Sequence, residues 1–227
     1  MIRGAWILLL LSGCASSTGV GHARLLAEDE YALTFGLDLG VSFSRLTPGQ
    51  DTPAPWPQGV IGARYGLGPV ELGARTWGWG LPTYFYTFGA AIDGKLALHQ
   101  SPSIEEGFDL ALGLDVGYHQ INYQQAPIHL LVVQAPLAFG WNLGGGDQLL
   151  FGVRLANHLM GGADQTLVNL LFGGFSIGYS WRALPGVDIR PEVVVLYSPV
   201  SFNGYAEDEE RRGLSIVQIG LGSAFSL

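Results

Sequence analysis

The sequence predicts an all-β protein, a closed antiparallel transmembrane β-barrel of ten strands. Of its 227 residues, 48% are hydrophobic and only 13% are charged, whereas about 25% of the residues of an ordinary soluble domain are charged. The longest apolar run, residues 5–11, is much shorter than the roughly 18 apolar residues that a transmembrane helix needs. From residue 31 onward, apolar residues instead alternate with small or polar ones, which is the period of a β-strand.

The first predicted strand, residues 31–46, alternates without a break over its first 13 residues. One face carries only apolar or aromatic side chains: Tyr31, Leu33, Phe35, Leu37, Leu39, Val41 and Phe43. The other face carries small or polar residues, with Asp38 at its centre. Strands of globular proteins usually have about 5–6 residues, whereas a membrane-spanning strand needs about 9–11. The length of this segment favours a membrane strand.

Nine further segments repeat the alternation, each with an apolar face and a small or polar face. They are residues 59–67, 70–78, 84–98, 107–118, 128–142, 148–156, 170–182, 187–197 and 213–227. A soluble β-protein would also alternate, but its polar face would meet water and carry many Lys and Glu residues. Here the polar faces are mostly Gly, Ala, Ser and Thr, which favours the inside of a narrow cylinder.

Some local features conflict with ten regular strands and leave eight strands as the alternative. Pro136 and Pro191 lie inside predicted strands but have no N–H group for the ladder, so we expect bulges around them. Trp77 and Trp79 break the alternation of residues 70–78. This break predicts a bulge or a strand end near Gly78.

The polar faces carry six basic and seven acidic residues, and the apolar faces carry no charge within the segments. A Lys or Arg facing lipid at the bilayer midplane of a barrel costs about 2–4 kcal/mol. The near balance predicts paired ions that largely fill a confined interior. The predicted interior network contains Asp38, Arg64, Glu71, Arg75, Asp93, Lys95, Asp109, Asp115, Arg154, Arg182, Arg190 and Glu192, with Asp188 on the same face.

The N-terminus has one positive charge at Arg3, the apolar stretch of residues 5–11, and small residues before Cys14. It resembles the signal peptide of bacterial lipoprotein precursors, which implies cleavage before Cys14 and a covalent lipid on that residue. We therefore expect a signal peptide at 1–13, a lipidated cysteine with a flexible linker at 14–29, and a barrel at 30–227. We expect no other cofactor. Because Cys14 is the only cysteine, no disulfide or Cys/His metal site can form within the chain.

Residues 31–227 resemble small Gram-negative outer-membrane β-barrel proteins in architecture, without matching a specific family. Such barrels have short periplasmic turns and longer extracellular loops. The odd-numbered predicted connections have 12, 5, 9, 13 and 15 residues, and the even-numbered ones have 2, 8, 5 and 4. These lengths predict that the N-terminus and the C-terminus are both periplasmic. The class usually ends in an aromatic residue that the barrel-assembly machinery recognises, a partner that we expect here, although the chain ends in Leu227.

Catalytic residues are not evident. Enzymes with this architecture, such as omptin-like proteases and lipid A deacylases, use His with carboxylates or Ser at the barrel mouth. His119 and His158 have inward parity near the outer rim, with Ser42, Ser44 and Asp164 as possible neighbours. No Asp-x-His or His-x-Ser spacing accompanies them, so the sequence favours a protein that is not an enzyme.

The interior and the loops suggest a structural or surface-interaction role. About eight strands leave an interior that side chains just fill, whereas 16–18 leave a channel. Because ten strands lie near the filled end of this range, a narrow small-solute channel is the alternative function. A hydrolase or acyltransferase at the rim is a weaker alternative. The acidic run 207–210 indicates either a solvated loop or a cation-bridged contact with lipopolysaccharide. The net charge of −8 disfavours nucleic acid as a partner. The remaining expected partner is the lipid of the outer membrane.

Overall fold

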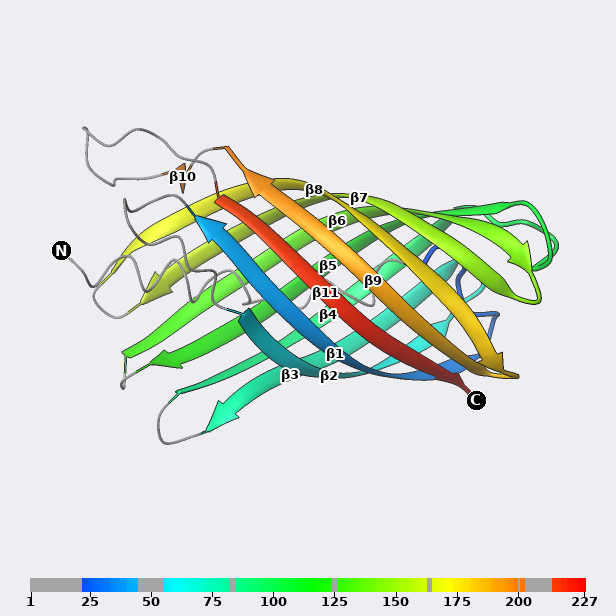
Figure 1. Ribbon diagram of the computed structural model, residues 1–227, viewed down its shortest axis with the longest axis horizontal. Coiled ribbons are helices and arrows are strands. Elements are labelled where there is room, and N and C mark those ends of the chain that lie inside the picture. The colour runs from blue at the N-terminus through cyan, green and yellow to red at the C-terminus, as the bar shows by residue number, and fades with distance from the viewer. Residues whose placement is uncertain are drawn as a thin grey trace.

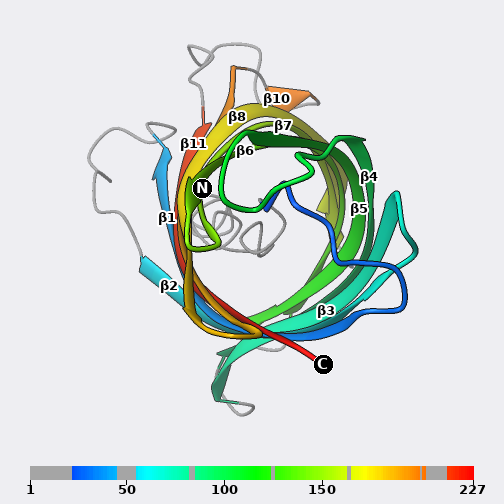
Figure 2. The same cartoon turned by 90° about the vertical axis from the view of Figure 1, so that its right-hand side faces the viewer.

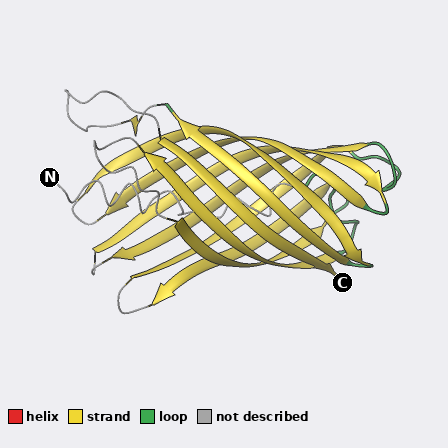
Figure 3. Ribbon diagram, viewed as in Figure 1, coloured by secondary structure: helices red, strands yellow, loops and turns green. Residues whose placement is uncertain are grey.

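The computed structural model describes residues 22–44, 55–81, 85–123, 126–162, 165–199, 201–202 and 214–227. These residues contain no helix, and so none that could cross a membrane. Figures 1 and 3 show long, tilted strands: β1 (Tyr31–Ser44), β2 (Pro55–Gly66), β3 (Val70–Leu81), β4 (Phe85–His99), β5 (Phe108–Tyr123), β6 (Ala126–Gly144), β7 (Asp147–Gly162), β8 (Gln165–Leu184), β9 (Val187–Ser198), β10 (Ser201–Phe202) and β11 (Leu214–Ser226).

Ten of these strands close into a ring, which Figure 2 shows end-on. From β1 to β8 each strand pairs antiparallel with the next along the chain, and β9 pairs with both β8 and β11. The pairing of β1 with β11 completes the ring. The two-residue β10 pairs only with β8, at Ser201↔Leu170, and is not part of the ring. The prediction of ten strands is confirmed, and the eight-stranded alternative is wrong.

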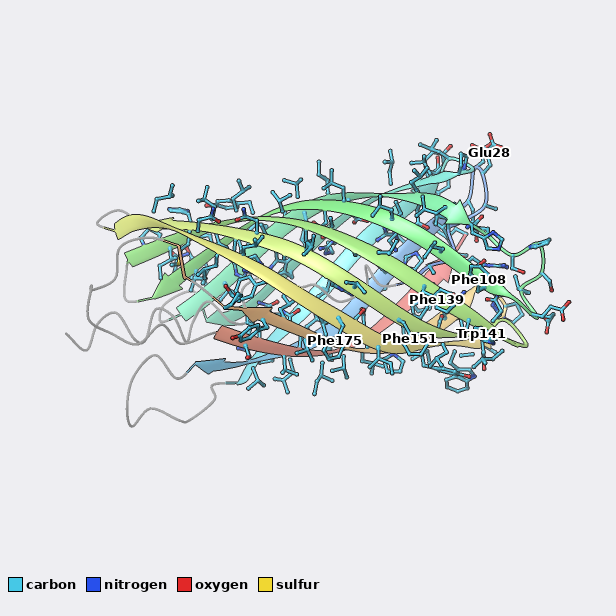
Figure 4. All side chains as sticks on the ribbon, turned by 90° about the horizontal axis from the view of Figure 1, so that it is seen from above. Glu28, Phe108, Phe139, Trp141, Phe151 and Phe175 are labelled. Carbon is cyan, nitrogen blue, oxygen red and sulfur yellow. The ribbon has the colours of Figure 1, made fainter. Side chains whose placement is uncertain are left out.

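The two faces of the wall differ as the alternation predicts. Outward side chains are apolar and exposed, and Leu37 and Ile92 each keep 68% of their surface exposed. Inward polar side chains such as Asp38 and Glu71 are buried. Figure 4 shows outward aromatic side chains on β5–β8; Phe108, Phe139 and Trp141 lie near the end that holds the C-terminus, and the rings of Phe108 and Phe139 stack with centroids 5.4 Å apart.

The two strand prolines do not cause the bulges expected from the sequence. The register between β5 and β6 is the same on both sides of Pro136, and the register between β9 and each neighbour is unchanged across Pro191. Gly113 faces Pro136, and a Cβ atom at Gly113 would lie only 2.8 Å from the Cγ atom of that ring. The missing side chain opposite the proline makes the room that a bulge would otherwise provide.

Near Gly78 no bulge interrupts β3 either. The register between β3 and β4 runs unbroken from Val70↔Leu96 to Leu81↔Phe85, while the pairing with β2 ends at Gly78. Trp77 breaks the sequence pattern because its ring points into the barrel, where it is only 2% exposed. Gly89 on β4 leaves space for that ring, since a Cβ atom there would lie 2.2 Å from it.

Several strands are longer than predicted, and the connections are correspondingly shorter. β5 ends at Tyr123 and β6 begins at Ala126, so a predicted connection of nine residues shrinks to two. β7 and β8 are separated by only two residues where 13 were expected. The odd-numbered connections now range from 2 to 15 residues and the even-numbered ones from 2 to 8, so their lengths distinguish the two ends of the barrel less sharply. The alternation was hidden because it reverses here: apolar Ile121 and Met160 point inward, whereas polar Gln120 and Asn157 take outward positions.

Because the outward face is apolar, a charged residue placed on it should lower the stability of the barrel in a bilayer. Ile92 lies midway along β4, so Ile92→Arg should lower the free energy of unfolding from bilayers by about 2–4 kcal/mol. The control, Leu227→Arg, changes a residue that is 79% exposed at the end of the chain and should cost about 0–1 kcal/mol. Urea titrations in lipid vesicles measure both values. Equal costs would contradict a bilayer around this face.

Candidate functional site

The start of the described chain lies inside the barrel. Residues 22–30, here called the N-terminal segment, cross the mouth at which the C-terminus and the turns 67–69, 145–146 and 185–186 lie, as Figure 2 shows in blue. We call this end the near mouth. His22, Ala23 and Leu25 are buried. The prediction of a flexible linker over 14–29 is therefore wrong for its described part, because residues 22–27 are bound to the barrel wall.

His22 fits between two charged groups of the wall. Its Nε2 lies 3.1 Å from Oε1 of Glu71 on β3, and its Nδ1 lies 2.8 Å from Nζ of Lys95 on β4. A carboxylate can only accept, so Nε2–H donates to Glu71, and Nδ1 of the neutral ring accepts from Lys95. Desolvation and the charge of Lys95 lower the pKa of His22 to about 3. The docked histidine is thus neutral at pH 7.

Arg24 and Leu26 attach the N-terminal segment at two more points. The guanidinium of Arg24 donates to both carboxylate oxygens of Asp109, with Nε 3.0 Å from Oδ2, and to the backbone carbonyl oxygens of Ser101 and Ser103. The amide of Leu26 donates to Oε2 of Glu71 over 2.9 Å. These contacts also fix the 100–107 connection against the near mouth.

A charge count could have revealed this docking from the sequence. The predicted interior had seven acidic and six basic residues. Arg24 supplies the missing positive charge, because it pairs with Asp109, which is fully buried. The residues of the segment lack strand periodicity, so the alternation that revealed the strands gave no sign of it.

The near mouth is not completely filled. Beside the N-terminal segment lies a cavity of about 540 Å³, lined by Arg24, Arg182, Asp188 and Arg190 among others. Asp188 bridges two arginines: Oδ2 accepts from Nη2 of Arg190 over 2.9 Å, and Oδ1 lies 3.5 Å from Nε of Arg182. These groups are partly exposed, so they form a wet, charged vestibule.

Deeper in the lumen, the charges form a continuous chain along the wall. Arg64 pairs with Glu71 and Asp93, and Arg75 pairs with Asp93 and Asp115. All five side chains are buried. The chain crosses from β2 to β5, and Gln134 on β6 extends it by donating to Asp115 over 2.8 Å. We call it the ion-pair chain.

The remaining predicted network residues also point inward, in separate places. Arg154 on β7 pairs with Glu192 on β9, and Lys95 lies 3.9 Å from Glu71. Asp38 is buried on β1. Arg182 and Arg190 belong to the vestibule rather than to the ion-pair chain.

The other half of the lumen is apolar, which the sequence analysis did not predict. Its buried side chains come from nine of the ten barrel strands and form one cluster. The cluster, here called the apolar cluster, contains Val60, Trp77, Ala91, Ile121, Ile128, Leu130, Val132, Ala156, Met160, Leu170, Phe172, Val194, Leu196 and Ile216. Paired charges thus occupy only the half of the interior nearer the C-terminus.

His119 and His158, the weak catalytic candidates, are buried in this apolar half rather than exposed at a rim. Nδ1 of His119 accepts a hydrogen bond from Nε1 of Trp77 over 3.0 Å, and the ring of His158 packs on Phe172 with centroids 4.7 Å apart. Among the residues described, neither histidine bonds to a carboxylate or a hydroxyl group. The arrangement of a general base oriented by an acid is therefore not formed here.

Four predicted site residues cannot be compared with the geometry. Cys14 and Asp164 lie outside the described residues, as does the acidic run 207–210. Ser42 and Ser44 lie on β1, but only their backbone is described. Within the described ranges no cluster of three potential metal ligands occurs.

Comparison with solved structures gives the fold. An outer membrane channel from Pseudomonas putida F1 matches with a TM-score of 0.56 and 8% identity, over 93% of this chain and 100% of that one. The outer membrane protease OmpT from Escherichia coli matches with a TM-score of 0.50 and 9% identity, over 91% and 99%. The chain has the fold of Gram-negative outer-membrane β-barrels. No family model and no curated protein matches the sequence.

Because the ion-pair chain is buried, removing Asp93, the acid that its two arginines share, should destabilise the protein strongly. Asp93 bridges two buried arginines, so Asp93→Leu should lower the free energy of unfolding by about 3–5 kcal/mol. Asp188→Leu is the matched control, because Asp188 also bridges two arginines but in the solvated vestibule, and should cost about 1 kcal/mol or less. Urea unfolding in vesicles measures both. Similar losses of stability in the two variants would contradict the account in which Asp93 is buried and Asp188 is solvated.

The neutral state of His22 predicts a pH dependence of docking. A released His22 has an ordinary pKa of 6.5, whereas the docked one titrates at about 3. Between these values only the released segment binds the proton, so docking weakens as the pH falls below 6.5, by about 1.4 kcal/mol per pH unit. An NMR titration of the His22 ring measures the pKa directly. A midpoint near 6.5 would show that the residue is not docked, and His22→Gln should abolish the pH dependence.

Proposed function

We propose that this protein is an outer-membrane β-barrel lipoprotein with a structural or surface-interaction role, and that its own N-terminal segment closes it toward the periplasm. The fold and the uncharged, exposed outer face support a site in a bilayer. The observation that carries the proposal is the docking of residues 22–27. A chain that places buried, paired side chains across its own mouth is suited to a stable scaffold more than to an open pore.

The docking contacts are of the kind that resist release. Glu71 and Asp109 are fully buried, and each receives hydrogen bonds from the N-terminal segment. Removing one partner of a buried, hydrogen-bonded charge leaves the other unpaired at a cost of about 3–5 kcal/mol. Opening the near mouth would break several such contacts at once.

The proposed lipid anchor is compatible with this docking. Cys14 precedes the buried His22 by eight residues. An extended chain of that length spans roughly 26–29 Å. This reach allows the chain to leave the near mouth and pass around the rim to the adjacent leaflet. A lipid on Cys14 would then hold that mouth, with both termini, on the periplasmic side.

A narrow channel is the second candidate. The cavity of about 540 Å³ beside the N-terminal segment is the observation that favours it, since it leaves a polar vestibule open to solvent. One solved structure of similar fold is described as an outer membrane channel. A protease also shares the fold, but neither His119 nor His158 pairs with a hydroxyl or carboxylate group among the residues described here, so we propose no enzymatic activity.

Recordings in planar lipid bilayers separate the two candidates. The mature wild-type protein should give no single-channel steps, because the N-terminal segment blocks the near mouth. Replacing residues 22–27 with a Gly/Ser sequence of equal length removes His22 and Arg24 and should produce steps of defined conductance. The same replacement at residues 15–20 is the control and should remain silent. Steady conductance of the wild type would overturn the closed barrel and favour the channel.

A further inference from the structure

A second cavity, here called the inner cavity, lies inside the lumen next to the vestibule. Its volume is about 40 Å³, and its lining comes from β1, β2, β3, β9 and β11. One water molecule needs about 10–15 Å³ of such space, so the inner cavity has room for about three waters, or for one monatomic ion. Arg190 lines both cavities, which places the inner one within reach of solutes that enter the vestibule.

Two glycines keep the inner cavity open. Gly36 on β1 pairs with Gly222 on β11, and Gly222 pairs on its other side with Arg190 on β9. A Cβ atom at Gly222 would have its nearest neighbour 3.7 Å away, at the carbonyl oxygen of Arg190. A methyl group at this position would therefore occupy part of the cavity without a clash.

The lining of the inner cavity is basic. Arg64, Arg75 and Arg190 contribute to it, and no acidic residue does so among those that the structure describes. Arg64 and Arg75 belong to the ion-pair chain, whereas Arg190 shares the carboxylate of Asp188 with Arg182. Within the described ranges neither of these last two arginines pairs with another acid. Two positive charges thus face one negative charge beside the inner cavity.

Three hydrogen-bond donors of this lining have no partner in the described part of the chain. They are Nη1 of Arg64, Nη1 of Arg190 and the hydroxyl group of Thr34. The other nitrogen atoms of both guanidinium groups already donate to side chains of the wall. None of the three free donors is sealed from solvent, so an ion in the cavity can reach them.

We propose that the inner cavity binds a small monovalent inorganic anion of the size of chloride. The anion accepts hydrogen bonds from Nη1–H of Arg64, from Nη1–H of Arg190 and from the Thr34 hydroxyl. Charge-assisted hydrogen bonds of this kind are about twice as strong as neutral ones. The volume of about 40 Å³ excludes an anion as large as gluconate. No residue of the N-terminal segment lines the inner cavity, so this site does not depend on the proposed closure of the near mouth.

The test measures the stability of the full mature protein in lipid vesicles, in sodium chloride and in sodium gluconate at equal ionic strength. An ion that binds only the folded barrel stabilises it by mass action, so the urea midpoint should rise with chloride until the site is saturated. Gluconate should give no saturable rise, because it does not fit the inner cavity. A general salt effect would instead change the midpoint steadily and equally in every variant.

Two pairs of variants locate the site. Arg190→Gln should remove the saturable rise, and Arg182→Gln should keep it, because Arg182 shares Asp188 but does not line the inner cavity. Gly222→Ala fills the cavity with a methyl group and should also remove the rise. Gly94→Ala adds a methyl group on the outer face, 3.6 Å from its nearest atom, and should keep the rise. Gly222→Ala alone suffices if Arg190→Gln does not fold.

Crystals grown in bromide locate the ion directly. Anomalous density of bromide should lie between Arg64 and Arg190. Equal urea midpoints in the two salts, or bromide found only on the protein surface, would overturn the proposal. A chloride effect that Arg182→Gln and Arg190→Gln reduce equally, or that survives in Gly222→Ala, would also overturn it.

Discussion

Charge inside the barrel must be paired, and much of the interior is arranged to meet this constraint. Glu71, Asp93 and Asp115 are buried on three successive strands, β3 to β5. Each carboxylate would be costly in a low-dielectric wall without a partner. Arg64 and Arg75 join them into one chain of ion pairs. Because each arginine bridges two acids, the contacts favour one relative placement of four strands.

The same constraint explains why the N-terminal segment lies inside the lumen. Among the described residues, no basic side chain of the strands pairs with Asp109. Arg24 of the N-terminal segment forms that ion pair. His22 fits between Glu71 and Lys95, where a neutral imidazole can donate to the first and accept from the second. Beyond the ion-pair chain the wall carries apolar residues instead, so the lumen is divided into a charged half and an apolar half.

The alternation of side chains predicted ten strands because a lipid-facing strand must be apolar on one face along its whole length. It failed where the pattern reverses, with apolar Ile121 and Met160 inward and polar Gln120 and Asn157 outward, and so underestimated the length of β5 to β8. Proline rules predicted a bulge at Pro136 but contain no information about the opposing Gly113. The charged side chains of the site followed from parity alone, whereas the docking of residues 22–27 depends on tertiary contacts without a periodic signal.

The central claim is that the N-terminal segment is part of the folded barrel. Hydrogen–deuterium exchange of the mature protein in nanodiscs tests it most directly. The amide of Leu26 donates to Glu71 and that of Asp29 donates to the carbonyl of Gly66, so both should exchange slowly, on the time scale of the strands. Exchange of both amides at the rate of an unstructured peptide, while the strands remain protected, would contradict the account.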